Sequence, residues 1–126
     1  MNMNSITINI KLIINYIRLK KLQFLCNNFH FERWTNISSK TDVEIAKNSN
    51  VMFGRGLHTR QNVIIAVREE AELSIGRNVF INRNTIITCH KRIIIGDNVM
   101  IGPNCCFYDH DHNVTNLSGG DLFLIM

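Results

Sequence analysis

The chain has 126 residues, 45% of them apolar, which is enough for one modest hydrophobic core and too few for two independent domains. Lysine and arginine exceed aspartate and glutamate by four, and the excess is local. The clustered cations near the start are Lys11, Arg18, Lys20 and Lys21. Because they are not interleaved with aromatic residues in a recognisable motif, a nucleic-acid-binding protein is not predicted.

The N-terminal segment 1–40 is predicted to be an amphipathic or capping segment that precedes the remainder of the domain at 41–126. Its four cations exclude a membrane-spanning helix, which needs about 20 uncharged residues, and no small-residue cleavage site marks a signal peptide. As a helix, it carries one apolar stripe formed by Ile6, Ile10, Ile13, Ile17 and Phe24. Such a helix either lies on an anionic membrane surface or packs over one end of the domain and covers a sheet edge.

The four cysteines show no CxxC spacing, and two of them, Cys105 and Cys106, are adjacent. Neither a disulfide framework nor a zinc knuckle is predicted from this arrangement. A reducing cytoplasm is therefore the expected location.

A 20-residue internal repeat fills the second half of the chain. ELSIGRNVFINRNTIITCHK (72–91) aligns without gaps with RIIIGDNVMIGPNCCFYDHD (92–111). In each copy an apolar residue recurs every six positions, with a second apolar or small residue two positions before it. The six-residue positions are Ile75, Ile81 and Ile87 in the first copy and Ile95, Ile101 and Phe107 in the second. This period excludes a helix.

Inward residues at i and i−2, followed by Gly or Asn, are what a short strand and a tight corner require. Three such strands form a triangular coil of about 18 residues, and the 20-residue period leaves two extra residues in one corner, near 89–91. We therefore predict an all-β parallel β-helix that starts near Lys40, with an N-terminal helical segment. In this stack Ile75, Ile81 and Ile87 lie next to Ile95, Ile101 and Phe107, respectively.

IGRNVFINRNTII and the following IGDNVMIGPNCCFYDHDH resemble the left-handed β-helix hexapeptide acyltransferases, in particular the maltose, galactoside and polysaccharide O-acetyltransferases. The resemblance extends over about residues 41–113. It implies a left-handed parallel β-helix, a homotrimer, and an active site in the cleft between neighbouring chains. It also implies acetyl-CoA as acyl donor, a sugar hydroxyl as acceptor, and a cytoplasmic role in polysaccharide biosynthesis. If the basic N-terminal segment lies on the membrane, the enzyme would be peripheral at the inner face, near membrane-linked acceptors.

Through this resemblance, the family's catalytic histidine falls on His112 and its substrate-side asparagine on Asn82. A sugar hydroxyl is a weak nucleophile at neutral pH, so its attack on a thioester needs a base such as neutral imidazole. Asp109 or Asp111 would orient that imidazole, and the sequence does not choose between them. His90 lies at the enlarged corner and is expected to line the cleft.

Two alternatives accompany this hypothesis. His90, His110 and His112 would be the ligands of a metal site like that of the γ-class carbonic anhydrases, although the His-x-His spacing fits the acetyltransferases better and no metal is predicted.

Members of the family continue with further hexapeptide coils that form much of the acetyl-CoA site, whereas NVTNLSGGDLFLIM follows here. The chain therefore resembles a C-terminally truncated member, and an inactive oligomerising or binding module is the second alternative. For Trp34, the options are a cover over the open end of the prism or an aromatic platform for the acceptor.

Overall fold

The computed structural model describes the backbone of residues 3–109 and 121–124, and the side chains of residues 10–109. Within these ranges a single helix, α1 (Met3–Leu25), precedes twelve short strands. The strands are β1 (Phe29–Phe31), β2 (Asp42–Ile45), β3 (Asn50–Phe53), β4 (His58–Thr59), β5 (Ile64–Val67), β6 (Glu72–Ile75), β7 (Phe80–Ile81), β8 (Ile86–Cys89), β9 (Arg92–Ile95), β10 (Met100–Ile101), β11 (Cys106–Tyr108) and β12 (Asp121–Leu124).

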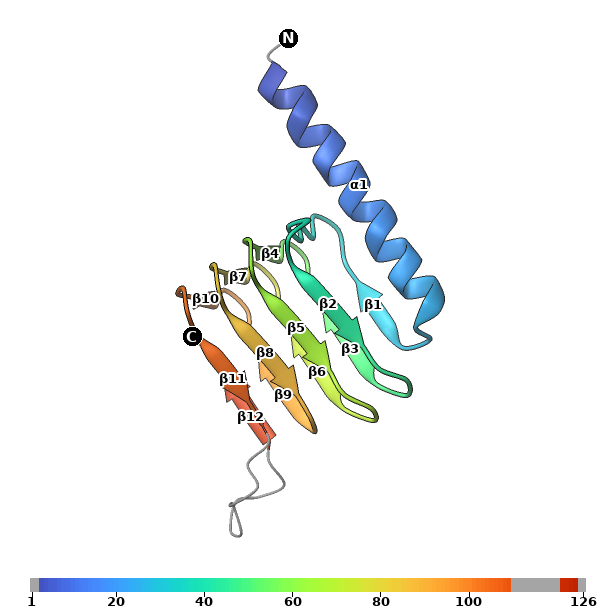
Figure 1. The fold of residues 1–126 in the computed structure, drawn as a ribbon, viewed down its shortest axis with the longest axis vertical. Coiled ribbons are helices and arrows are strands. Elements are labelled where there is room, and N and C mark those ends of the chain that lie inside the picture. Colours follow the sequence, from blue (N-terminus) through green and yellow to red (C-terminus); the bar gives the residue numbers. More distant parts are fainter. Residues whose placement is uncertain (1–2, 110–120, 125–126) are drawn as a thin grey trace.

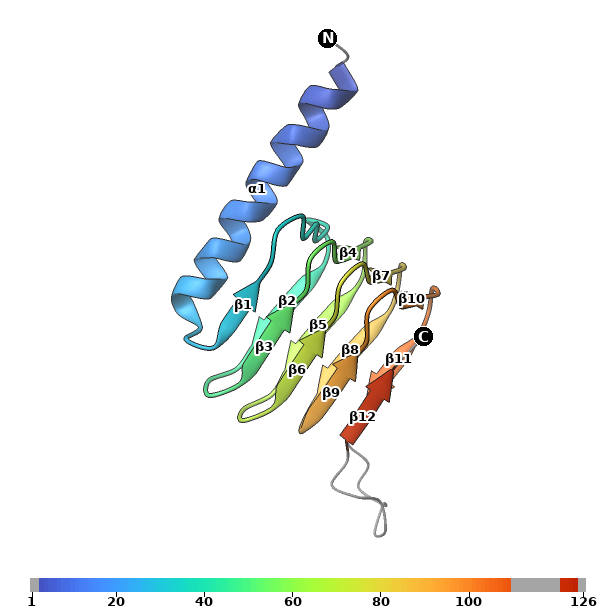
Figure 2. The ribbon, with the colours of Figure 1, turned by 180° about the vertical axis from the view of Figure 1, so that it is seen from behind.

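The strands form three all-parallel sheets, one on each side of a solenoid of about four coils (Figure 1; Figure 2). The first sheet has the order β1-β3-β6-β9-β12, the second β4-β7-β10 and the third β2-β5-β8-β11. Each strand therefore pairs with the strand one coil away and not with its neighbour in sequence, which is the arrangement of a repeat protein. The predicted parallel β-helix is confirmed at the level of a β-solenoid.

The coil lengths follow from the strand register. Phe29 pairs with Val51 and Asn50 with Glu72, so the first two coils each take 22 residues. Glu72 pairs with Arg92, which gives the 20-residue repeat seen in the sequence. The predicted stacking is confirmed, since Ile75, Ile81 and Ile87 pair with Ile95, Ile101 and Phe107.

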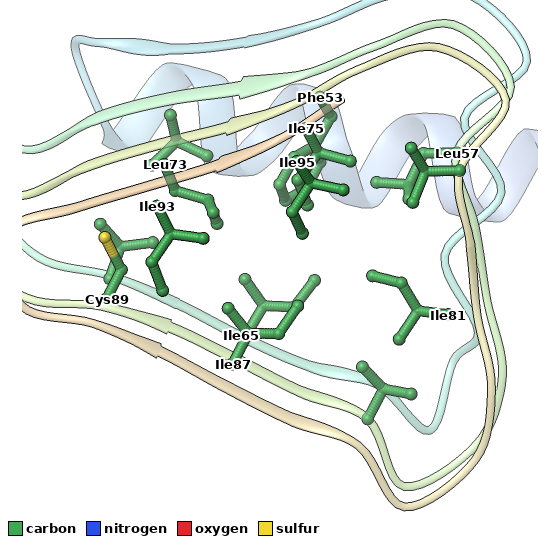
Figure 3. Packing of buried hydrophobic residues seen from close by; sticks show 14 of the residues in the cluster. Phe53, Leu57, Ile65, Leu73, Ile75, Ile81, Ile87, Cys89, Ile93 and Ile95 are labelled. Carbon is green, nitrogen blue, oxygen red and sulfur yellow. The ribbon is translucent and has the colours of Figure 1, made fainter. Parts of the chain in front are cut away.

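The core is a set of apolar columns that run along the solenoid axis. Figure 3 shows Phe53, Ile75 and Ile95 stacked on one side of a roughly triangular outline, with Ile65 and Ile87 on another side. Alternate strand residues point inward, so a strand such as β6 buries Leu73 and Ile75. Because each column continues from coil to coil, a mispaired register would break several columns at once.

Asparagines with positive φ make many of the corners. Asn78 and Asn98 have φ values of 57° and 61° at one corner, and Asn62, Asn84 and Asn104 repeat this conformation at another corner. Asparagine tolerates the left-handed region better than other residues with a Cβ. The corners are also tied together, since the Asn62 side-chain amide donates to Oδ1 of Asn84 at 3.2 Å.

The solenoid begins nearer the N-terminus than the repeat indicates. Strand β1 pairs with β3, and Asn36 forms an isolated bridge with His58, so the first coil already starts at Phe29. The spacing near residues 29–37 is too irregular to be recognised as a repeat, although Phe29 and Ile37 are buried in the common core.

Helix α1 lies across this first coil and hydrogen-bonds to its exposed edge. The Asn15 side chain donates to the carbonyl of Thr35 at 2.5 Å and accepts from the N–H of Ile37 at 3.1 Å. Arg18 donates to the carbonyl oxygens of Ser38, at 2.8 Å, and Thr41. An open sheet edge presents unpaired backbone groups, and α1 supplies partners for several of them.

The apolar part of the same contact is the fully buried Leu19, with Leu22 and Cys26 packed against the core. Within the described residues, no helix is both long and apolar enough to span a membrane.

Candidate functional site

The corner between β8 and β9 differs from the equivalent corners of the two preceding coils. Four residues join β2 to β3 and β5 to β6, whereas only His90 and Lys91 join β8 to β9. We call residues 90–91 the short corner. This corner is two residues shorter than its counterparts, which accounts for the change from a 22-residue to a 20-residue coil. It is the same corner where the sequence predicts two residues more than an ideal 18-residue coil needs.

The Asp109 carboxylate closes the short corner. Its Oδ1 accepts from the backbone N–H of His90 at 2.6 Å, and its Oδ2 accepts from those of Lys91 at 2.7 Å and Arg92 at 2.6 Å. The residue is buried although it follows the last residue of β11. Three consecutive N–H groups that converge on one anion form a backbone nest.

The earlier corner shows what the carboxylate replaces. In residues 68–71, the N–H of Arg68 donates to the Cys89 carbonyl one coil later, and the N–H of Ala71 closes a turn onto the Arg68 carbonyl. The short corner lacks the residues to repeat this turn, so its amides need an acceptor from elsewhere. Asp109, one coil after Cys89, provides it.

The coil that contains Asp109 is longer in sequence than the coil before it. Arg92 pairs with Asp121, so 29 residues separate β9 from β12, compared with 20 for the coil before. The additional residues fall between Asp109 and β12. His112 and Asp111, the predicted base and one of its predicted orienting acids, belong to this interval and lie outside the described residues, as does His110.

The described site residues fall into two places. His90 and Asp109 meet at the short corner, through the His90 N–H. Asn82 follows β7 at a different corner, where its Oδ1 accepts from the N–H of Arg83 at 2.8 Å and its own N–H donates to the Ile101 carbonyl. Strand β8 separates the two corners, and its four residues span about 13 Å. One chain therefore does not bring Asn82 to the short corner.

Cys89 is the neighbour of Asp109 that the sequence did not single out. Its Sγ lies 3.1 Å from the Glu72 carbonyl oxygen and 3.9 Å from Oδ2 of Asp109. The alignment of the two repeat copies pairs Cys89 with Asp109, so the apposition was available from the register. What the sequence could not show is that Asp109 turns back into the corner.

Burial, and then the nearby Asp109 carboxylate, raise the pKa of the Cys89 thiol from 9.0 to about 12. Since folding favours the thiol, its stabilising contribution is complete below pH 9 and is lost as the pH rises to about 12. At pH 8 we expect iodoacetamide to label the exposed Cys106 and leave Cys89 unlabelled until urea unfolds the protein. Peptide mass spectrometry measures both sites, and equal native labelling rates would contradict the burial of Cys89.

In the described part of the chain, residues 3–109 and 121–124, no group of three or more His, Cys, Asp or Glu side chains is placed to hold a metal ion. Of the three histidines weighed as ligands, only His90 lies in that part.

Two grooves flank α1 at the opposite end of the solenoid. One, of about 390 Å³, is lined by Tyr16, Lys20, Phe31 and Trp34 among others, and Lys20 Nζ lies 5.7 Å from the ring centroids of both Tyr16 and Phe31. Trp34 is 65% exposed, so α1, and not Trp34, covers the end of the solenoid.

No protein-family model, no curated protein and no solved structure matches this chain. The assignment of a function therefore depends on the residues and geometry described above.

Proposed function

We propose that this chain is a hexapeptide-type acyltransferase with a left-handed β-helix, which moves an acetyl group from acetyl-CoA to a hydroxyl of a sugar or polysaccharide. The observation that carries the proposal is the position of Asp109, which is hydrogen-bonded to the short corner and is the first residue of the Asp-His-Asp-His sequence, in a coil nine residues longer than the previous one. Insertions in repeat proteins form loops on one face, often the binding face. Asp109 is held at the short corner and lies three residues before His112 in the sequence.

In the proposed reaction, His112 acts as a general base in direct transfer. The acceptor hydroxyl oxygen attacks the thioester carbonyl carbon while the imidazole takes the hydroxyl proton. The tetrahedral intermediate then expels the CoA thiolate as the C–S bond breaks, and the imidazolium returns the proton to that sulfur. Asn82 would hold the acceptor or stabilise the carbonyl oxygen as it gains charge.

A site shared between chains is part of the proposal. Asn82 lies one strand away from the short corner within a chain, and in the trimer that the resemblance implies Asn82 of one chain would face His112 of its neighbour. A homotrimer provides three such contacts. In this arrangement His90, next to Asp109, would line the cleft.

The test is release of free CoA thiol from acetyl-CoA in the presence of a panel of sugars. We expect a His112→Ala variant to lose about 100-fold to 10,000-fold of the acceptor-dependent rate, as is typical for a general base. His30→Ala is the matched control, because His30 is exposed on β1 at the other end of the solenoid.

Acceptor-dependent release that is absent, or equal in the wild type and His112→Ala, would exclude the transferase. The chain would then act as an oligomerising or binding module, and light scattering would measure whether it forms trimers.

A further inference from the structure

Helix α1 turns an apolar stripe away from the solenoid. Ile10, Ile13, Ile17 and Phe24 are 51%, 59%, 61% and 86% exposed. Their spacing of three, four and seven residues places them on one face of the helix. This face is the stripe that the sequence predicts, and the remainder of the described chain does not cover it.

The helix docks on the solenoid through a different face. Asn15 and Leu19 are buried there, and Arg18 donates to two carbonyl oxygens of the first coil. Figure 1 and Figure 2 show α1 at the end of the stack, with its N-terminal part projecting beyond the coils. The stripe therefore forms part of the outer surface at this end of the molecule.

The charge around the stripe has one sign. Between Met3 and Leu25 there are four lysines and arginines and no aspartate or glutamate. Lys11 and Lys21 are exposed on the helix, and Lys20 keeps its ammonium over the Tyr16 and Phe31 rings. A face that combines apolar side chains with cations suits an anionic, partly apolar partner.

A basic groove extends this surface onto the solenoid. It has a volume of about 360 Å³, and Lys11, Arg18, His58 and Arg60 contribute to its lining, while none of its described lining residues is acidic. Burial and the nearby Arg60 lower the pKa of His58, so the positive charge at neutral pH comes from the other three. Anionic headgroups would find cations here beside the stripe.

We infer that this face of α1 binds an anionic lipid surface, with the helix lying in the plane of the membrane. Ile10, Ile13, Ile17 and Phe24 enter the boundary between headgroups and acyl chains, and the flanking lysines contact the headgroups. A second copy of α1 would cover the stripe equally well, but it would bring cations against cations with no acid on either helix to pair them.

The experiment is co-sedimentation of the full chain with vesicles of phosphatidylcholine alone or with 30% phosphatidylglycerol, at low and high salt. We expect binding to the anionic vesicles only, with a marked loss at high salt. The single Trp34, exposed beside α1, reports binding independently through its emission.

Two pairs of variants locate the surface. An Ile13→Ser/Ile17→Ser variant is expected to bind at least tenfold more weakly, because each exposed isoleucine contributes apolar area to the membrane contact. Met100→Ser is its control, because Met100 is exposed on β10 and distant from α1. Lys21→Glu is expected to weaken binding several-fold, whereas Arg83→Glu, at a far corner, is not.

Equal binding to both vesicle types, or no binding, would overturn the inference. So would self-association that disappears in the Ile13→Ser/Ile17→Ser variant without any vesicle binding, because it would identify a second copy as the partner. Circular dichroism checks the fold of each variant, and Lys21→Glu together with the salt dependence tests the inference even if the double variant unfolds.

Discussion

An Asp109→Asn variant is expected to lose about 3–5 kcal/mol of its free energy of unfolding. The carboxylate accepts three partly buried backbone N–H bonds, and bonds of this charge-assisted kind contribute about 1.5–3 kcal/mol each. Asparagine keeps one acceptor oxygen and directs an NH2 group at the remaining N–H groups. Urea unfolding followed by circular dichroism measures the loss.

Asp97→Asn is the matched control for Asp109→Asn. Among the described residues, Asp97 accepts one backbone N–H from the neighbouring coil, that of Arg77 at 2.7 Å, and its Oδ2 lies 3.7 Å from the Arg77 guanidinium; both groups are exposed. We expect this change to cost less than about 1 kcal/mol. If the two variants were equally stable, the short corner would not depend on Asp109.

The second large effect is expected for Gly54→Ala. A Cβ on Gly54 would lie 2.4 Å from both the carbonyl carbon and the carbonyl oxygen of Gly76 in the next coil. Backbone atoms in a stacked coil cannot move aside as a side-chain end can, so we expect a loss of about 3 kcal/mol or more.

Gly102→Ala provides the comparison, because a Cβ there meets no atom within 4 Å. Its effect on the free energy of unfolding should stay within about 1 kcal/mol. Thermal unfolding of both variants separates a clash between coils from a general intolerance of alanine at corners. Equal losses would contradict the close approach of the Gly54 and Gly76 segments.

The repeating part of the fold was predictable because the signal is local. Inward residues two positions apart and a six-residue period fix strands, corners and stacking together, and the pairing of Ile81 with Ile101 confirms this. The first coil was not predictable in the same way. Phe29 and Ile37 are core residues, but the segment between them lacks the period of the later coils.

The orientation of α1 depends on groups far away in the sequence. The sequence predicts the apolar stripe, and packing over the end of the domain is one of the two predicted uses of the helix. The helix does pack there, but through Asn15 and Arg18 and not through the stripe, and the partners of these two side chains are carbonyl and N–H groups 20 to 23 residues later. No pattern within the helix reveals those partners.

In the candidate site, too, the local features were predictable and the long-range contacts were not. The alignment of repeat copies identifies the corner at His90, whereas the inward turn of Asp109 depends on how many amides a two-residue corner leaves without a partner. The roles of His112, Asp111 and Asn82 stay predictions.

The hydrogen bonds of Asp109 also bear on the order in which the solenoid forms during synthesis. The carboxylate is synthesised 17 to 19 residues after the backbone N–H groups that donate to it. While the ribosome adds these residues, the third coil has its strands but lacks the acceptor for its last corner. Helix α1 is likewise synthesised 20 to 23 residues before the first-coil groups to which it hydrogen-bonds. Both ends of the solenoid are therefore completed by contacts between residues about one coil apart, which form only after the next coil has been synthesised.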